Sequence, residues 1–135
     1  MRLDNYLVKV KGIRSRSWAK KLIQENKVLV NNIPVKKAGV FIDSLDVVQL
    51  LEDFKYVSRG GYKLEKALDL FDIQVSGRVC LDVGSSTGGF TDCLLQNGAR
   101  LVYGIDVGSG QMDEKIKSDP RVVCLEKINA RRLDD

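Results

Sequence analysis

Residues 78–95, RVCLDVGSSTGGFTDCLL, decide the fold of the larger part of this chain. An apolar run ends in Asp82, a glycine-rich turn follows through Gly89, and a helical pattern begins at Phe90. Glycine lets a backbone approach a ligand closely, and the first turn of a helix offers free N–H groups. The stretch therefore predicts a buried parallel strand, a ligand-binding turn and a helix.

The residues that follow repeat this pattern. Residues 101–105 form a second apolar run, residues 111–117 can form a helix, and residues 121–125 form a third run. Asp106 directly follows the second run and comes 24 residues after Asp82. That spacing is close to the one at which an acid binds ribose hydroxyls in a Rossmann-type unit. The predicted order is therefore βαβαβ, with a cofactor site.

The spacing of the glycines narrows the choice of ligand. A dinucleotide fingerprint reads Gly-x-Gly-x-x-Gly, and a P-loop ends in Gly-Lys-Ser/Thr. This chain has neither, because Gly84 is followed by Gly88 and Gly89, with Asp82 before them. The form Asp-x-Gly-x-x-x-Gly suits S-adenosylmethionine, whose ammonium group needs nearby oxygens and which has no pyrophosphate. A glycine-rich turn without a ligand is the alternative interpretation.

Residues 58–71 predict a further helix before the first strand. Ser58 can serve as its N-cap, and Arg59 and Lys63 would project near the edge of its apolar stripe. Residues 51–57 contain no Gly, Pro or Ser, so they do not resemble a long flexible linker. The stripe consists of Leu64, Ala67, Leu68 and Phe71.

The distribution of charge divides the chain near residue 50. The net charge is +4, but residues 1–50 carry 10 Lys and Arg against 4 Asp and Glu, whereas residues 51–135 carry 12 against 14. A basic module beside a near-neutral one indicates that the first binds a polyanion, a solvated basic face being the alternative. We therefore predict one domain over residues 1–50, a connection over 51–57 and a second domain over 58–135.

The basic domain is predicted to contain two helices and a small sheet. Apolar stripes at helical spacing predict two helices separated by Gly12, the second of them capped by Ser15. Short apolar runs around Asn31-Asn32 predict a hairpin, and residues 47–50 predict a third strand. The two stripes consist of Leu3, Tyr6, Leu7 and Val10, and of Trp18, Ala19, Leu22 and Ile23.

Basic residues of the second helix and its approach would form a cationic surface for phosphates. Structured RNA is the more natural partner, because a small rigid basic surface can read an A-form backbone by shape. Trp18 lies on the apolar stripe, which favours a core residue over a base-stacking platform.

The strings RLDNYLV (residues 2–8) and SRSWAKKLIQENKVLVNN (residues 15–32) resemble the S4 RNA-binding domain, which has the αL fold. The predicted RNA-binding residues are Arg2, Arg14, Arg16, Lys20, Lys21 and Arg59.

The whole string resembles a larger family. SRGGYKLEKAL (residues 58–68) and TGGFTDCLL (residues 87–95), together with the S4-like pattern, resemble the TlyA family of S4-domain ribosomal RNA 2′-O-methyltransferases, often labelled haemolysins. The resemblance implies an α+β S4-like (αL) RNA-binding domain followed by a partial α/β Rossmann-like class I methyltransferase domain of the FtsJ type. It also implies S-adenosylmethionine as the cofactor and ribosomal RNA or a ribosomal subunit as the partner.

The same resemblance implies roles for single residues. Lys63 matches the first lysine of the FtsJ-type Lys-Asp-Lys-Glu tetrad, a cluster that would orient or deprotonate the 2′-hydroxyl. The segment 126–129 would lie near the adenine. The residues implied in cofactor binding are Asp82, Gly84, Ser86, Thr87, Gly88, Gly89, Phe90, Asp106 and Asn129.

Composition argues against other kinds of function. The chain has no histidine, and its three widely spaced cysteines argue against a disulfide framework or a metal site and suit a reducing cytoplasm. No apolar run approaches the roughly 18 residues of a membrane span, and no strongly amphipathic cationic helix is obvious, which disfavours a pore-forming haemolysin. A non-enzymatic RNA-binding protein with a degenerate second domain is the alternative to a methyltransferase.

The length raises a further expectation. The second domain supplies three predicted strands, and the other three tetrad members are absent from the 135 residues. We therefore expect weak or no methyl transfer by these residues alone. The open side of the first strand would be an exposed edge, so self-association through that edge is a further expectation.

Overall fold

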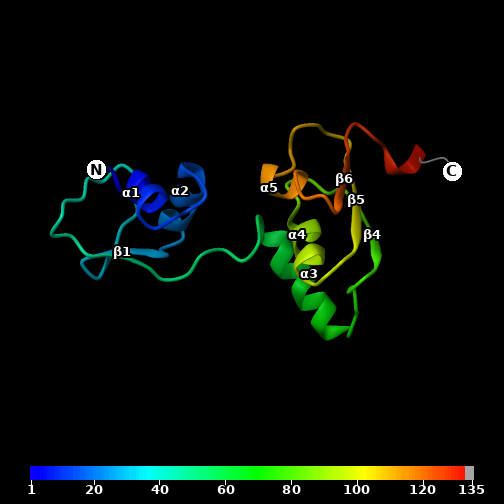
Figure 1. Ribbon diagram of the computed structural model, residues 1–135, viewed down its shortest axis with the longest axis horizontal. Helices are drawn as coiled ribbons and strands as arrows, with labels where there is room; N and C mark the ends of the chain where they lie inside the picture. The colour runs from blue at the N-terminus through cyan, green and yellow to red at the C-terminus, as the bar shows by residue number, and fades with distance from the viewer. Residues whose placement is uncertain (133–135) are drawn as a thin grey trace. The chain divides into compact units, whose positions relative to one another are not determined.

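The computed structural model describes residues 1–132, and the chain divides into two compact units. The first unit runs from Met1 to Phe54, and the second begins at Lys55. Each unit has its own three-stranded sheet, and Figure 1 labels most of their helices and strands along the chain.

The first unit combines two helices with an antiparallel sheet of order β2-β1-β3. All four residues of the predicted stripe of the second helix are buried, which confirms that prediction. In the first helix Leu3 and Leu7 are buried, but Val10 is 58% exposed because the helix ends one residue before it. The elements are α1 (Leu3–Lys9), α2 (Arg16–Gln24), β1 (Val28–Val30), β2 (Ile33–Pro34) and β3 (Val48–Leu50).

Ser15 and Trp18 behave as predicted. The Ser15 Oγ accepts a hydrogen bond from the backbone N–H of Trp18 at 3.1 Å, which caps α2. Trp18 is 8% exposed, and its indole N–H donates to the Asp53 carboxylate at 2.6 Å. Its ring meets Phe54 edge to face at a centroid distance of 5.6 Å. Trp18 therefore belongs to the core.

The hairpin forms at the predicted turn. Asn31 and Asn32 both have left-handed backbone angles, with φ of 52° and 66°. A two-residue turn of this type requires positive φ at both positions, and asparagine tolerates it better than most residues. The Asn31 side chain also donates to Asp46 and accepts the N–H of Val47, both at 2.9 Å, which ties the turn to the segment before β3.

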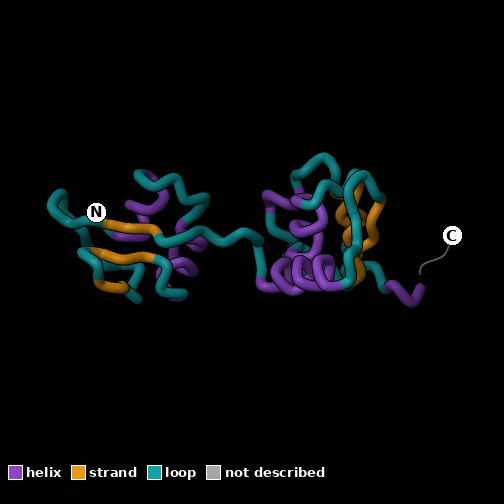
Figure 2. Tube along the Cα trace, turned by 90° about the horizontal axis from the view of Figure 1, so that it is seen from below, coloured by secondary structure: helices purple, strands orange, loops and turns teal. Residues whose placement is uncertain are grey.

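The second unit contains a parallel sheet of order β4-β5-β6, which confirms the predicted βαβαβ order. Helices α3 and α4 lie on the same side of this sheet in Figures 1 and 2. The last α-helix is shorter than the predicted 111–117. The elements are α3 (Arg59–Leu70), β4 (Val79–Val83), α4 (Gly89–Gln96), β5 (Leu101–Ile105), α5 (Glu114–Lys117), β6 (Val122–Leu125) and the 3-10 helix η1 (Ala130–Arg132).

The first strand of this sheet is less buried than predicted. Val79, Leu81 and Val83 are 49%, 56% and 57% exposed, whereas Asp82 on the opposite face is 6% exposed. The reason is that β4 lies at the edge of the sheet and that no α-helix of residues 55–132 covers its outer face (Figure 2). The strand is therefore buried on one face only.

Two predictions for α3 are also corrected. Ser58 occupies the N-cap position, but its side chain makes no capping hydrogen bond. Phe71 is 69% exposed rather than part of the apolar stripe, because α3 ends at Leu70 and Phe71 is its C-cap.

The first turns of α3 and α4 approach each other closely. A side chain at Gly89 would overlap the Ser58 hydroxyl, and its Cβ would lie 3.0 Å from the backbone nitrogen of Gly61. The Asp92 carboxylate, 7% exposed, accepts the N–H of Val57 at 2.8 Å and fastens the chain before α3 to α4. This approach brings the SRGG and TGGF strings together.

Candidate functional site

Asp82 places a buried carboxylate near the carboxyl end of β4. Its Oδ2 accepts a hydrogen bond from the Thr91 hydroxyl of α4 at 2.7 Å. Burial raises the pKa of Asp82, the Thr91 hydrogen bonds oppose that rise, and the charge of Asp106 adds to it. A nearby cation would stabilise the ionised form of this buried carboxylate.

Asp106 follows β5 and fastens the glycine-rich loop to it. Its Oδ1 accepts the N–H of Gly108 at 2.9 Å, and its Oδ2 accepts the N–H of Ser86 at 2.7 Å. These backbone hydrogen bonds lower the pKa of Asp106, so the group is ionised at neutral pH. A carboxylate has about four acceptor positions, so acceptor capacity remains beyond the hydrogen bonds from Gly108 and Ser86.

The loop between β4 and α4 uses most of its N–H groups within the chain. Those of Gly84 and Ser85 both donate to the Ile105 carbonyl, and that of Gly88 donates to Ser85, while the N–H of Ser86 binds Asp106. Such a loop has few donors left for a phosphate, which argues against a pyrophosphate ligand. A Cβ at Gly84, whose φ is 74°, would meet no atom within 4 Å, so the loop is open at this point.

The segment after β6 runs beside the same acid. The N–H of Ile128 donates to the Asp106 carbonyl at 2.9 Å, and that of Lys127 to the Gly108 carbonyl at 3.0 Å. Asn129 follows directly and is exposed, and its side-chain oxygen accepts the N–H of Arg131 at 2.9 Å. Within residues 1–132, no acceptor forms a hydrogen bond with the side-chain amide N–H groups of Asn129, so these groups can still bind a ligand.

The structure thus gathers the predicted cofactor residues around one end of the sheet. Thr87 contributes its carbonyl to the N–H of Asp113 at 2.9 Å, and Gly88 has a left-handed φ of 104° as the N-cap of α4. Phe90 departs from this group, because its ring, 43% exposed, lies 3.3 Å from the Cβ position of Gly60 on α3. Its contact is therefore with α3.

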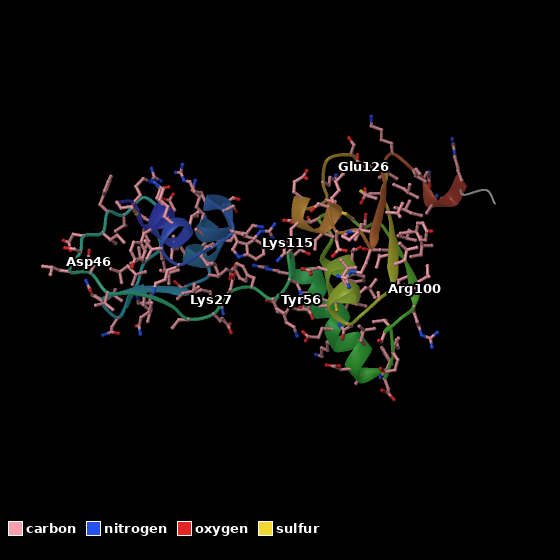
Figure 3. The ribbon with its side chains drawn as sticks, viewed as in Figure 1. Lys27, Asp46, Tyr56, Arg100, Lys115 and Glu126 are labelled. Atoms are coloured by element: carbon pink, nitrogen blue, oxygen red, sulfur yellow. The ribbon has the colours of Figure 1, made fainter. Side chains whose placement is uncertain are left out.

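Lys63 and Arg59 lie one turn apart on α3. Lys63 is exposed, and within residues 1–132 no carboxylate forms an ion pair with its ammonium group. The start of α3 packs against the first turn of α4, which directly follows the glycine-rich loop. Tyr56 lies beside the start of the same helix (Figure 3).

The other predicted RNA-binding residues lie in the first unit, and four of the five form two groups. Arg2 and Arg16 both bind Asp4, while Arg14 and Lys21 lie over the Trp18 ring at 4.6 and 5.9 Å from its centroid. Lys20 is exposed and lies on α2 one turn after Arg16. The structure does not relate Arg59, in the second unit, to these groups.

Asp4 is a member of this surface that is absent from the predicted RNA-binding residues. Its side chain is fully buried and joins the first turns of α1 and α2. One signal was present: Asp4 stands between the buried positions Leu3 and Leu7 of the apolar stripe. The pairing with Arg16, twelve residues away, has no local signal.

The described residues lack two further kinds of feature. Residues 1–132 hold no cluster of three or more cysteine or acidic side chains that could bind a metal ion. None of their helices has the length and apolar character needed to cross a membrane.

Comparison with known families agrees with both units. A model described as FtsJ-like methyltransferase matches residues 56–135, and an S4 domain model matches residues 1–48. The chain belongs to the FtsJ-like methyltransferase family. Within it, the added S4 domain confirms the resemblance to TlyA proteins that the sequence motifs predicted, and with it the predicted fold class.

Three relatives of this FtsJ-like protein show how far the likeness extends. Hemolysin A of Brachyspira hyodysenteriae is 45% identical over 99% of this chain and 56% of its own length. The 16S/23S rRNA (cytidine-2′-O)-methyltransferase TlyA of Mycobacterium tuberculosis is 44% identical over 98% of this chain and 50% of its own. A solved structure from Streptococcus thermophilus, provisionally named a hemolysin, is 41% identical over 99% of this chain and 50% of its own, with a TM-score of 0.62. The chain spans about half the length of the curated relatives it matches.

Proposed function

We propose that this chain forms the RNA-binding and cofactor-binding part of an S-adenosylmethionine-dependent ribosomal RNA 2′-O-methyltransferase. The observation that carries the proposal is the pair of carboxylates at one end of the sheet, with Asp106 joined to the glycine-rich loop through Ser86. The curated TlyA relative supports the choice of ribosomal RNA and of the ribose 2′-hydroxyl. A ribosomal RNA substrate would place the chain in the cytoplasm.

The donors and acceptors of the site fit S-adenosylmethionine. Asp106 would accept the ribose hydroxyls, and Asp82 would offset the ammonium group, whose charge would in turn stabilise a buried carboxylate. The loop from Gly84 to Gly89 would lie along the methionine portion, and the exposed Asn129 would lie near the adenine. The bound cofactor supplies an electrophilic methyl group.

Lys63 would act on the ribose 2′-hydroxyl that accepts the methyl group. Its ammonium group, on the helix that packs against α4, would orient the ribose 2′-hydroxyl and lower the cost of removing its proton. We assign the phosphates of the RNA to Arg2, Arg14, Arg16, Lys20 and Lys21, with Arg59 beside the acceptor nucleotide.

Titration calorimetry on the 135-residue chain tests the cofactor assignment. S-adenosylmethionine should bind, whereas NAD should not, because the loop has few N–H groups left for a pyrophosphate. Failure of S-adenosylmethionine to bind at millimolar concentration would contradict the cofactor site and leave an RNA-binding protein without this activity.

Neutralising two exposed cations of the first unit tests the RNA assignment. The double variant Arg16→Gln/Lys20→Gln should bind a short RNA hairpin roughly tenfold more weakly, and the slope of log K against log salt should fall by about 2, because two phosphate contacts are lost. Fluorescence anisotropy across a salt series measures both quantities.

The matched control carries the same change of charge elsewhere. Lys9 and Lys11 are exposed at the other end of α1, so Lys9→Gln/Lys11→Gln should leave most of the affinity intact. Equal losses in the two double variants would mean that net charge alone attracts the RNA and that the chosen face is wrong.

A further inference from the structure

Asp4 is a buried charge that holds two arginines of the first unit. Its carboxylate accepts hydrogen bonds from the Arg2 Nε and Nη2 at 3.2 and 3.1 Å and from the Arg16 Nη2 at 3.3 Å. It also accepts the N–H of Asn5 at 2.8 Å. The Asp4 side chain is 0% exposed, whereas those of Arg2 and Arg16 are 40% and 54% exposed. One face of this network is therefore sealed in the core and the other faces solvent.

The electrostatics keep Asp4 charged. Burial alone would raise the pKa of Asp4, but the hydrogen bonds from Arg2, Asn5 and Arg16 outweigh that effect and lower it. The carboxylate is therefore ionised wherever the protein is folded near neutral pH. Its negative charge offsets the repulsion between two guanidinium groups that approach the same point.

The backbone leaves room for this arrangement. A Cβ at Gly39 would lie 3.4 Å from the Arg2 Nη2, so the Arg2 guanidinium packs against the chain at that glycine. The N–H groups of Leu3 and Asp4 donate to the carbonyls of Val40 and Ala38 at 2.7 and 3.1 Å, which fixes the start of α1 against the same segment. Arg2 is thus held from both sides, by Asp4 and by the segment at Gly39.

We propose that Asp4 is a positioning residue for RNA binding: it presents the guanidinium groups of Arg2 and Arg16 as a preformed pair that binds the RNA backbone. This rests on the RNA-binding function proposed above. Arginine has five N–H donors, and Arg2 uses two of them on Asp4, so outward donors remain for phosphate oxygens. A preformed pair loses less side-chain freedom on binding than two free arginines.

The variant Asp4→Asn distinguishes this role from simple electrostatics. It removes a negative charge beside the RNA surface, so long-range attraction alone predicts tighter binding. Loss of positioning predicts the opposite, a roughly fivefold to tenfold weaker affinity for the RNA hairpin. The salt slope should stay near that of the unchanged protein, because both arginines remain. Fluorescence anisotropy on the 135-residue chain measures both.

The control is an aspartate with the same chemistry in the other unit. Asp119 accepts two hydrogen bonds from the Arg121 guanidinium group, at 3.1 and 2.9 Å, and lies outside the proposed surface. Asp119→Asn should leave RNA affinity unchanged or slightly raised.

A second variant, Arg16→Lys, keeps every charge but replaces the planar guanidinium group that Asp4 orients. It should also weaken RNA binding and leave the salt slope unchanged. Arg16→Lys still tests the positioning role if Asp4→Asn does not fold.

The outcomes separate this inference from the proposed function. Weaker RNA binding by folded Asp4→Asn and by Arg16→Lys supports the positioning role. Affinity equal to or above that of the unchanged chain in either folded variant overturns it, while weaker binding by Arg16→Gln/Lys20→Gln would still support the RNA surface. If that double variant also binds normally, both the surface and the positioning role are wrong.

Discussion

Replacing Asp106 by alanine should remove nearly all affinity for S-adenosylmethionine. The carboxylate would accept two ribose hydroxyls, and a hydrogen bond to a charged group contributes about 1.5–3 kcal/mol, so the two together correspond to a loss of at least about a hundredfold. The variant also frees the N–H groups of Ser86 and Gly108, which loosens the glycine-rich loop. Titration calorimetry of the purified 135-residue chain measures the change.

Asp69→Ala provides the matched control for this variant. Asp69 is an exposed aspartate in α3, outside the proposed cofactor residues, and its loss changes the net charge by the same amount. Affinity in this variant should stay within a factor of two, as expected of an exposed substitution away from the site. If Asp106→Ala binds the cofactor as tightly as Asp69→Ala does, Asp106 has no part in the site.

The pH dependence of binding separates the two acids. The pKa of Asp82 lies above its ordinary value of 3.8 because of burial, and that of Asp106 lies below 3.8 because of its backbone hydrogen bonds. As the pH falls, Asp82 therefore takes up its proton first, and affinity should begin to fall above pH 3.8. The contribution of Asp106 persists there and is lost only as the pH falls through its lowered pKa. Asp82→Asn should abolish the earlier fall.

Local patterns predicted much of this fold from the sequence. The hairpin at Asn31-Asn32, the cap at Ser15 and the βαβαβ order depend on neighbouring residues, and all three are present. The errors at Val10 and Phe71 lie at helix ends, where a stripe continues in the sequence after the helix has stopped. Periodicity alone does not mark that end.

Long-range partners in the site had no local signal. The spacing of Asp82 and Asp106 pointed to a cofactor site, but the hydrogen bond from Ser86 to Asp106 depends on how the loop folds onto β5. The Asp4–Arg16 pair depends in the same way on the packing of α1 against α2. The exposed face of β4 depends on which elements cover the sheet, a property that no stretch of the strand encodes.

Replacing Gly61 by alanine should destabilise the second unit strongly. The new Cβ would overlap the Tyr56 ring, with its Cδ2 only 2.8 Å away, and that ring is held in place: Tyr56 is 3% exposed and meets Tyr62 edge to face at 5.1 Å. Burial, together with the hydrogen bond to Cys93, raises the pKa of Tyr56 to about 12. Overpacking typically costs about 1–3 kcal/mol, and a contact this close with a fixed ring should lie at the upper end.

Gly60→Ala in the same helix is the matched control. Both substitutions gain about 1 kcal/mol of helix propensity, but a Cβ at Gly60 has no contact shorter than 3.3 Å. It would meet the Phe90 ring, which is 43% exposed and can move aside, at 3.3 Å and the Ser58 hydroxyl at 3.5 Å, an ordinary van der Waals contact. We therefore expect Gly60→Ala to be neutral or slightly stabilising, and Gly61→Ala to lower stability by about 2 kcal/mol, or roughly 10 °C in Tm for a unit of this size.

Hydrogen exchange measured by mass spectrometry locates the effect of the Gly61 substitution. Amides of α3 and α4 should exchange faster in Gly61→Ala, because the substitution pushes apart two helices that meet at Gly61 and Gly89. Amides of α2 should not change, and the fluorescence of Trp18, the single tryptophan, reports on that first unit. Equal stability of Gly60→Ala and Gly61→Ala would show that Tyr56 yields, and that the close approach of α3 to α4 does not depend on a glycine at this position.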